Sequence, residues 1–263
     1  MRERAGTDSP TGGAQAIRRA VEVVRLVAQI QRSGASLSRV ARASGLKTST
    51  AFRILHSLNE ERLLRYDQTD RCYYVGPLAY ELGLAAAADA HHVNWRDTVD
   101  QIARTTRLTT YLVSRADNDS VCLLCVQAQT ALRAVPIEVG QRMPLGVGAG
   151  SLVILASLGD EEVERVLSAH PTRLAAFPGG KVKPDRILKR IAFARQHGFA
   201  MSSGTIAPGV TGIGVAMPPQ GLTQLAMSVS AVANSISLPE AEKIAAILAT
   251  AIRSRSSRSP EFA

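Results

Sequence analysis

Apolar residues in the first quarter of the chain recur at the spacing of amphipathic helices. The second of two short segments carries one stripe at i, i+3, i+4 and i+7, formed by Ala51, Ile54, Leu55 and Leu58. The first segment carries a matching stripe, formed by Leu37, Val40, Ala41 and Ser44. Gly45 lies between them and permits a sharp turn, and Ser38 is expected to cap the start of the first helix. The pattern predicts a helix-turn-helix, which places its second helix in the major groove of DNA.

The outward stripe of the predicted second helix is polar and aromatic, and consists of Ser49, Phe52, Arg53 and His56. These side chains can donate to base edges and phosphates or touch a thymine methyl group. A pair of packing helices with no DNA function would show similar periodicity, so the flanking segments decide between the two interpretations.

Those flanking segments favour a winged domain. Two β-prone stretches, Leu63–Tyr66 and Cys72–Val75, flank a polar turn at Asp67–Asp70 and predict a hairpin behind the second helix. Arg65 and Arg71 would lie on this wing within reach of phosphates. Ahead of the motif, one more amphipathic helix is expected to pack on the pair through Ile17, Ala20, Val21, Val24 and Val27. Three helices and a hairpin predict a winged helix-turn-helix.

Charge is concentrated on this segment. Residues 1–78 carry 13 Lys or Arg against 7 Asp or Glu, a net charge of +6, of the +9 carried by all 263 residues. A positive excess on the part that holds the motif is typical of a phosphate-binding surface, whereas a general need for solubility would not concentrate it there.

From residue 93 onward, helical and extended patterns alternate. Strands are predicted at 109–114, 121–127, 132–139, 199–203, 211–217 and 225–231, and helices at 93–105, 148–158, 160–170, 184–197 and 239–253. Strands that cluster early and late around central helices favour an α+β domain with a curved antiparallel sheet. The preceding Ala- and Leu-rich segment has high helix propensity and small apolar side chains suited to packing against a second copy.

These patterns divide the chain into five expected parts. They are a disordered tail (1–12), a winged helix-turn-helix (13–76), a linker helix (77–92), a second domain (93–255) and a flexible tail (256–263). No apolar run approaches the roughly 20 residues needed to span a bilayer, and the N-terminus lacks the apolar segment of a signal peptide. We therefore expect a cytoplasmic protein without a membrane partner.

No catalytic set, metal site or cofactor is predicted. Cys122 and Cys125 have CxxC spacing but lie in a predicted strand, where positions three apart should point to opposite faces. His91 and His92 could bind a metal, but a solvated end of the linker is the simpler interpretation. Glycines at 146, 148 and 150 miss the spacing of a dinucleotide-binding loop. No nucleophile triad or pair of carboxylates can be argued from spacing.

Motifs in both predicted domains resemble the IclR-type bacterial transcriptional regulators. The first domain contains Ala16-Ile-Arg-Arg-Ala-Val-Glu-Val-Val-Arg-Leu26, Leu37-Ser-Arg-Val-Ala41, Gly45-Leu46, Arg53-Ile-Leu55 and Tyr74-Val-Gly-Pro-Leu78. The second contains Val139-Gly-Gln-Arg-Met-Pro-Leu145, Gly198-Phe-Ala200, Pro208-Gly-Val210 and Met227-Ser-Val-Ser230. The resemblance covers residues 15 to about 253. It implies a C-terminal GAF-like effector-binding domain, a homodimer that can pair into a tetramer, and control of promoters by a small metabolite.

The motif pattern and the resemblance together give candidate DNA-binding residues, which are Arg39, Lys47, Thr48, Ser49, Thr50, Phe52, Arg53, His56, Arg65 and Arg71. Where the family usually has Pro-Lys this chain has Lys47-Thr48, and Phe52 replaces a common His. The operator can therefore differ from those of relatives.

The resemblance also implies effector-binding residues, which are Leu145, Gly148, Ala149, Ser202, Gly212, Ser228 and Ser230. Acidic side chains common in this pocket are replaced here by Ser202, Ser203, Gly204 and Thr205. Gly148, Gly212 and Gly214 are expected to leave volume, and Gly148 and Ala149 at a helix start could offer N–H groups to a carboxylate. A small-residue, nearly uncharged pocket suits an aromatic or other apolar-bodied organic acid.

Two functions of different class follow from these features. The first is a DNA-binding transcriptional regulator, a homodimer on an inverted-repeat operator, controlled by a small-molecule effector. The alternative is a metabolite-binding, enzyme-like domain tethered to a DNA-binding module. Segments 146–151 and 202–214 contain no general base or nucleophile set, which favours the regulator.

Overall fold

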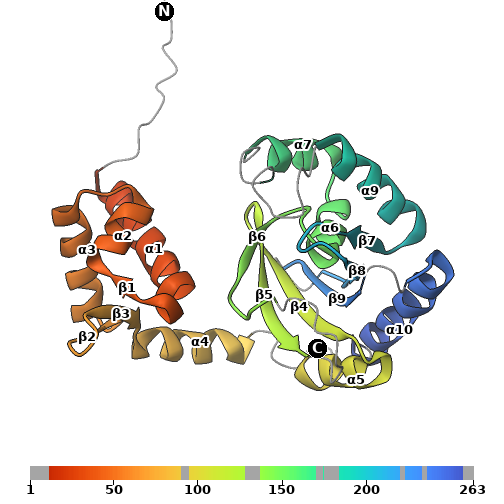
Figure 1. Ribbon diagram of the computed structural model, residues 1–263, viewed down its shortest axis with the longest axis horizontal. Coiled ribbons are helices and arrows are strands. Elements are labelled where there is room, and N and C mark those ends of the chain that lie inside the picture. Colours follow the sequence, from red (N-terminus) through yellow and green to blue (C-terminus); the bar gives the residue numbers. More distant parts are fainter. Residues whose placement is uncertain are drawn as a thin grey trace, which may run out of the picture. The chain divides into compact units, whose positions relative to one another are not determined.

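Helices α1 (Gly12–Ile30), α2 (Leu37–Ser44) and α3 (Thr48–Glu60) and a small antiparallel sheet build the N-terminal unit (Figure 1). The sheet has the order β1 (Ala35–Ser36), β3 (Cys72–Val75), β2 (Leu64–Asp67), and a 3-10 turn at Gln31–Ser33 leads into it. Helix α4 (Pro77–Asp89) follows. This computed structural model describes residues 12–89, 95–127, 137–169, 174, 184–219, 223–232 and 236–256. The predicted winged helix-turn-helix is confirmed, with β1 as a strand that the pattern did not indicate.

The turn between α2 and α3 depends on Gly45, which takes a left-handed conformation with φ +67°. The Gly45 amide donates to the Ala41 and Arg42 carbonyls and so ends α2. The prediction that Ser38 caps α2 is wrong, because the helix begins one residue before it, at Leu37. Ser36 takes the capping position instead, without a capping bond from its side chain, and its hydroxyl lies 3.3 Å from that of Ser38.

The core of the N-terminal unit is formed by buried apolar residues from every element around it: Val23, Val27, Ala35, Val40, Leu55, Leu64 and Tyr73. The predicted inward face of α1 is partly wrong, because Ile17 and Val21 are 69% and 43% exposed. Val23 points inward instead, and two residues along a helix correspond to about 200° of rotation. Val21 therefore faces away from the stripe that Val23 and Val27 define.

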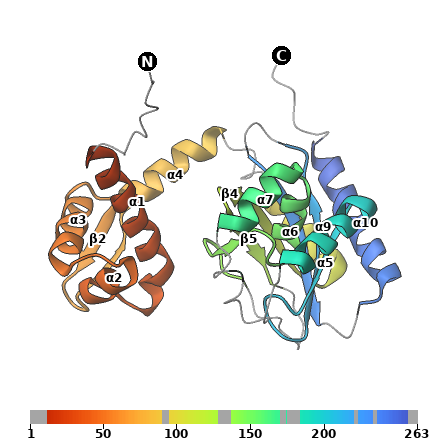
Figure 2. The ribbon, with the colours of Figure 1, turned by 90° about the horizontal axis from the view of Figure 1, so that it is seen from above.

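The C-terminal unit is an antiparallel sheet of six strands between two layers of helices (Figures 1 and 2). Its order is β6 (Arg142–Pro144), β5 (Asp119–Val126), β4 (Thr109–Ala116), β9 (Leu225–Val232), β8 (Val210–Ala216) and β7 (Ala200–Ser203). One face packs on α6 (Ala149–Ala156), α7 (Asp160–Ala169) and α9 (Pro184–His197). The other packs on α5 (Arg96–Thr106) and α10 (Leu238–Ser256). This arrangement confirms the predicted α+β class.

Some expected elements differ or lie outside the described residues. The predicted strand at 132–139 falls mainly in the undescribed segment 128–136, and its described end, residues 137–139, is not a strand. The short strand β6 pairs with β5 instead. Of the expected tails, only Gly12 and Ser256 are described, and both belong to helices. The rest of the tails, the His91-His92 pair and the last residues of the expected linker lie outside the description. No helix in the described ranges is long and apolar enough to cross a membrane.

Strand β5 contains a bulge that overturns one expectation. Leu124 pairs with Leu112 and Cys122 pairs with Val113, the next residue of β4. Leu123 therefore has no partner residue on β4 and forms a bulge. Cys122 and Cys125 consequently point to the same face and pack on the α6 side, whereas Leu123 and Leu124 pack on the α5 and α10 side. The alternation rule predicted opposite faces for the two cysteines, and the bulge breaks that alternation between them.

Candidate nucleic-acid interface and effector cavity

The outward face of α3 presents the predicted recognition stripe. Ala51 and Leu55 are buried against the other helices, so the side chains on the opposite stripe project into solvent: Thr48, Ser49, Phe52, Arg53 and His56. Lys47 precedes the helix and is exposed, and Thr50 is half-buried.

A groove of about 530 Å³ separates this face of α3 from the wing. Four residues of its lining were predicted to bind DNA: Thr48, Phe52, His56 and Arg71. The others were not predicted to do so: Ser36, Leu37, Ser38, Asn59, Tyr66 and Tyr73. Arg71 reaches the groove from the hairpin turn, where its φ is +56°. Serine is common near helix starts for local reasons, so nothing in the pattern marked Ser36 and Ser38 as groove residues.

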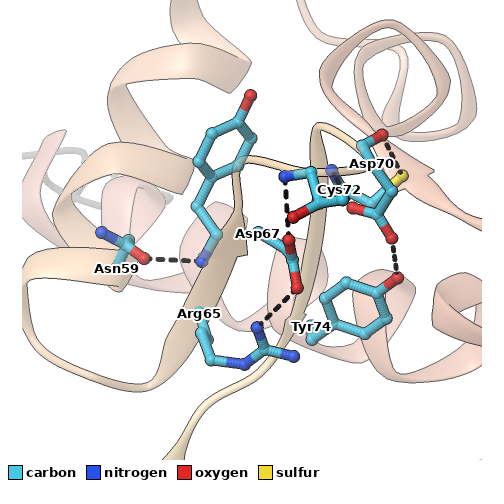
Figure 3. A network of polar contacts seen from close by, with 8 residues as sticks. Asn59, Arg65, Asp67, Asp70, Cys72 and Tyr74 are labelled. Carbon is cyan, nitrogen blue, oxygen red and sulfur yellow. Dashed lines mark hydrogen bonds and ion pairs between the residues drawn. The ribbon is translucent and has the colours of Figure 1, made fainter.

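The wing is held in shape by hydrogen bonds within the hairpin and to α3 (Figure 3). The Tyr66 amide donates to Asn59 Oδ1 at 2.8 Å, which ties β2 to α3. At the turn, Asp67 Oδ1 accepts from the Thr69 amide at 2.9 Å, and Arg65 Nη1 donates to Asp67 Oδ2 at 3.0 Å. The Thr69 amide, followed by Arg65, lowers the pKa of the Asp67 carboxyl. Asp67 therefore stays ionised and keeps the turn closed.

Asp70 braces the second strand of the wing (Figure 3). Its Oδ1 accepts from the Cys72 amide at 2.9 Å, and its Oδ2 accepts from the Tyr74 hydroxyl. The hydrogen bond to Asp70 raises the pKa of Tyr74 to about 12. The wing is a preorganised structure rather than a free loop, which reduces the entropy lost when it docks on a partner.

Two of the predicted DNA-binding arginines have partners within the N-terminal unit. Arg39 Nη1 donates to the Ser33 carbonyl at 2.6 Å and to the Gly34 carbonyl at 3.2 Å, so it closes the connection between α1 and α2. The Arg65 guanidinium pairs with Asp67 and lies 4.9 Å from the centre of the Tyr74 ring. Their roles in DNA binding stay predictions.

A second candidate site lies in the C-terminal unit, where the start of α6 faces strands β4, β8 and β9. Its described lining is Tyr111, Val113, Ile137, Met143, Val147, Gly148, Ala149, Gly150, Ser151, Ser202, Thr205, Ile206, Val210, Gly212, Ser228, Val229 and Ser230. The lining includes six of the seven predicted effector residues. Leu145 is the exception, because its side chain is 1% exposed within the core between the sheet and α6.

The polar groups of this cavity are mainly hydroxyls. Tyr111 Oη and Ser230 Oγ lie 3.4 Å apart on paired strands, and the buried Ser202 and Thr205 hydroxyls bond to each other. Tyr111 is the only residue of the described lining that can ionise. Burial raises the pKa of its hydroxyl, which keeps it a neutral donor. Sequence reasoning missed Tyr111, because it lies in a strand whose sequence, Thr-Thr-Tyr-Leu-Val-Ser-Arg-Ala, does not alternate between polar and apolar residues and so marks no separate face.

The glycines do not leave the volume expected of them. The cavity has only about 30 Å³ of free space, enough for about one water molecule. A Cβ atom on Gly214 would lie 2.7 Å from the Ala149 carbonyl group, so this glycine lets α6 pack directly on β8. A Cβ on Gly148 would meet the Ile206 side chain at 2.8 Å. The expectation of an open cavity is wrong for this conformation, because α6 and Ile206 occupy the space.

The start of α6 is directed at the cavity. Gly148 caps the helix with φ +82°, and its carbonyl accepts from the Leu152 amide at 2.9 Å. Ser151 Oγ donates to the Pro144 carbonyl at 3.2 Å and accepts from the Gly146 amide at 3.0 Å, which fixes the loop before the helix. The first amides of a helix have no partner within it and carry partial positive charge. The arrangement can therefore accept an anionic group at Ala149 and Gly150.

Comparison with known proteins gives the same two-part division. Residues 16–68 match the family described as "IclR helix-turn-helix domain", and residues 89–257 match "Bacterial transcriptional regulator IclR C-terminal". The second match alone covers more than half of the chain. The chain belongs to the IclR family. It is an IclR-family DNA-binding transcriptional regulator with a C-terminal effector domain.

Individual bacterial regulators resemble the chain over nearly its whole length. The HTH-type transcriptional regulator Rv1719 of Mycobacterium tuberculosis is 29% identical over 247 residues, which are 92% of this chain and 92% of that protein. The crystal structure of an IclR-type regulator from Alicyclobacillus acidocaldarius has the same fold, with TM-score 0.76 and 23% identity over 92% of this chain and 98% of that one. An IclR homolog from Microbacterium hydrocarbonoxydans, complexed with 4-hydroxybenzoate, matches with TM-score 0.69 and 23% identity over 91% and 99%.

Proposed function

We propose that this IclR-family regulator binds an inverted-repeat operator as a homodimer, and that an apolar-bodied organic acid controls the binding. The observation that carries the proposal is the cavity at the start of α6, where hydroxyls and helix amides face apolar walls. In the described lining no carboxylate side chain would repel an anion.

The effector carboxylate would lie at the start of α6 and the apolar body between the strands. Helix N-termini stabilise anions through free N–H groups and the helix dipole. Tyr111 and Ser230 offer neutral hydroxyls to a second polar group of the ligand, and Val113 and Val229 supply apolar wall. The Microbacterium homolog was crystallised with a hydroxylated aromatic acid, which is a ligand of this chemical class.

Effector entry requires the cavity to open, because its free space of about 30 Å³ is too small for an aromatic ring. The side chain that must move is Ile206, because it packs over Gly148 and lies on the short loop between β7 and β8. An effector that binds only the open conformation shifts the population toward the open conformation. The affinity for DNA then changes only if the open and closed conformations bind DNA with different affinities.

Helix α4 supports pairing with a second copy. Its large apolar side chains Tyr80 and Leu84 lie one turn apart on one face and are 71% and 54% exposed, whereas Leu82, 56% exposed, faces away from them. Packing Tyr80 and Leu84 against a partner helix would remove apolar surface from water and join two positively charged winged domains. Two joined domains would favour an inverted repeat, because the symmetry of the operator mirrors that of the dimer.

The experiment begins with the full-length protein and DNA duplexes enriched from a random-sequence pool. Affinity for the best duplex is then measured with benzoate, 4-hydroxybenzoate and hexanoate. Ser230→Leu should fill the cavity and abolish the response while DNA binding persists, because overpacking excludes the ligand. Tyr111→Phe should weaken the response to 4-hydroxybenzoate more than to benzoate. Ser168→Leu makes the same change at an exposed position of α7 and should respond normally.

A normal response of Ser230→Leu would place the effector elsewhere. Failure of the protein to enrich any duplex would contradict its proposed operator binding. A monomer by light scattering at micromolar concentration would contradict the proposed dimer.

A further inference from the structure

Phe52 is an apolar ring in the middle of a polar surface. It lies on the outward face of α3 with 49% of its surface exposed, between Thr48 and His56 one turn away on either side. The ring also lines the groove between α3 and the wing. Burial of an exposed aromatic side chain is most favourable against an apolar partner surface, because a polar partner would lose its hydrogen bonds to water.

The ring is held in a defined position by its neighbour. The Phe52 and His56 rings are stacked with an interplanar angle of 3° and a centroid distance of 5.8 Å. His56 Nε2 in turn lies 3.6 Å from a carboxylate oxygen of Glu60. His56 stacks on Phe52 from the C-terminal side of α3. The part of the Phe52 ring that His56 does not cover is available to a partner that approaches the outward face of α3.

The rest of the groove suits a nucleic-acid strand. Ser36, Ser38, Thr48 and Arg71 provide hydroxyl and guanidinium donors, the groups that contact phosphate oxygens. Asn59, the one residue of the described lining with a side-chain amide, already accepts a hydrogen bond from the Tyr66 amide. Donors that line the same groove as an aromatic ring suit a DNA strand, which carries both phosphates and bases.

The major groove of DNA presents only one apolar group, the 5-methyl of thymine. We propose that Phe52 reads one thymine in each half-site through this methyl group, while the strand that carries it lies in the groove between α3 and the wing. This inference rests on the proposed operator binding and adds the identity of a base that the protein selects. Phe52 acts as a specificity-determining residue, and His56 as the residue that positions it.

The test compares thymine with deoxyuridine, which lacks only the 5-methyl group. The best duplex enriched by the full-length wild-type protein is resynthesised with each thymine replaced singly, and affinities are measured by fluorescence anisotropy at physiological salt. Burial of one methyl group corresponds to about a 4-fold change in affinity. We expect this loss at one position in each half-site, and about a 15-fold loss when both symmetric positions are replaced.

Variants assign the effect to Phe52. Phe52→Ala should show no difference between thymine and deoxyuridine at the sensitive position, and Phe52→Leu should show a reduced one. Leu188→Ala is the matched control, because Leu188 is 46% exposed on α9, close to the value for Phe52. It should keep the full wild-type difference. Circular dichroism melting of each variant checks that the fold is retained.

The outcomes separate this inference from the function on which it rests. If duplexes are enriched but no deoxyuridine replacement weakens binding, Phe52 does not read a methyl group and operator binding stands. An equal loss in wild type and Phe52→Ala would assign the methyl contact to another residue and also overturn the inference. Should Phe52→Ala bind too weakly to measure, an undiminished thymine preference in Phe52→Leu would overturn it. If no duplex is enriched, operator binding fails and the inference fails with it.

Discussion

Cys122 and Cys125 lie on the same face of β5, because the bulge at Leu123 adds one residue between them. Both thiols face the α6 side of the sheet, close to the Tyr111 wall of the candidate effector cavity. Tyr111 pairs with Cys125 and Val113 with Cys122 across the two strands. Without the bulge the two cysteines would point to opposite faces of the sheet. With it, both side chains pack in the same core, on the α6 side.

These thiols should be unreactive in the native protein. Burial, followed by the charge of Cys125, raises the pKa of Cys122 to about 12, and burial also raises that of Cys125. Because only the thiolate attacks a disulfide reagent, the native protein should react slowly with Ellman's reagent at neutral pH. The thiols should react rapidly once guanidinium unfolds the chain. Fast native modification that mass spectrometry assigns to Cys122 would contradict this description of the site.

Arg53 and Arg39 should separate DNA binding from stability. Arg53 is exposed on α3, where a bidentate base contact is worth about 1–3 kcal/mol. Because a dimer loses two such contacts, Arg53→Ala should lower operator affinity by at least about 30-fold. Its melting temperature should not change. Arg39→Ala removes the donors to the Ser33 and Gly34 carbonyls and should lower the melting temperature instead. Anisotropy titrations and thermal melts on both variants test this, and undiminished affinity of Arg53→Ala would refute the assignment of α3 as the recognition helix.

Gly214→Ala should destabilise the C-terminal unit by about 1–3 kcal/mol, the usual cost of overpacking a core. The added methyl group would lie 2.7 Å from the backbone of Ala149, and a backbone cannot rotate away as a side chain can. Gly159→Ala is the control, because no atom lies within 4 Å of the position that its Cβ would occupy. Urea unfolding measures both, and equal midpoints for the two variants would show that α6 can shift away from β8.

Tyr74 should ionise well above its ordinary range. The hydrogen bond to Asp70 raises its pKa from the ordinary value of 10.0 to about 12, because the bond favours the neutral phenol. The stabilisation of the wing by this contact is thus complete below pH 10 and is lost as the pH rises from 10 to about 12. Ultraviolet titration, with Tyr74→Phe subtracted, should show a tyrosinate near pH 12 in wild type and closer to 10 in Asp70→Asn. The same midpoint in both would mean that Asp70 does not hold the hydroxyl.

Local patterns predicted most elements correctly. Helix α9 begins at Pro184 and ends at His197 as predicted, because proline favours a helix start and the segment lacks an internal breaker. The turn at Gly45 and the strand Cys72–Val75 also agree, and both follow from residues close in sequence. The first strand β1 was missed, since two residues are too few to show alternation.

The candidate sites were only partly predictable. Six of the seven implied effector residues line the cavity, because the family motifs identify the segments to which they belong. Tyr111 and Ile206 also line it and were not named by the sequence reasoning. Whether a strand residue faces a cavity depends on the helix packed over it, and no local pattern encodes that helix. For the same reason the groove at Phe52 could not be foreseen, because it needs the wing and the start of α2 to lie beside α3.

The sequence by itself determined where this protein forms most of its helices and strands, which helix carries the predicted recognition stripe and where positive charge gathers. Those properties depend on periodicity, turn residues and composition, which act over a few residues. Tertiary structure alone decided that Arg39 bonds to the backbone between α1 and α2 and that Cys122 and Cys125 share one face. It also decided that the space beside Gly214 is filled by α6 and not left open for a ligand. Each of these depends on the pairing register or on a partner distant along the chain, and a shift of one residue at Leu123 is enough to change the outcome.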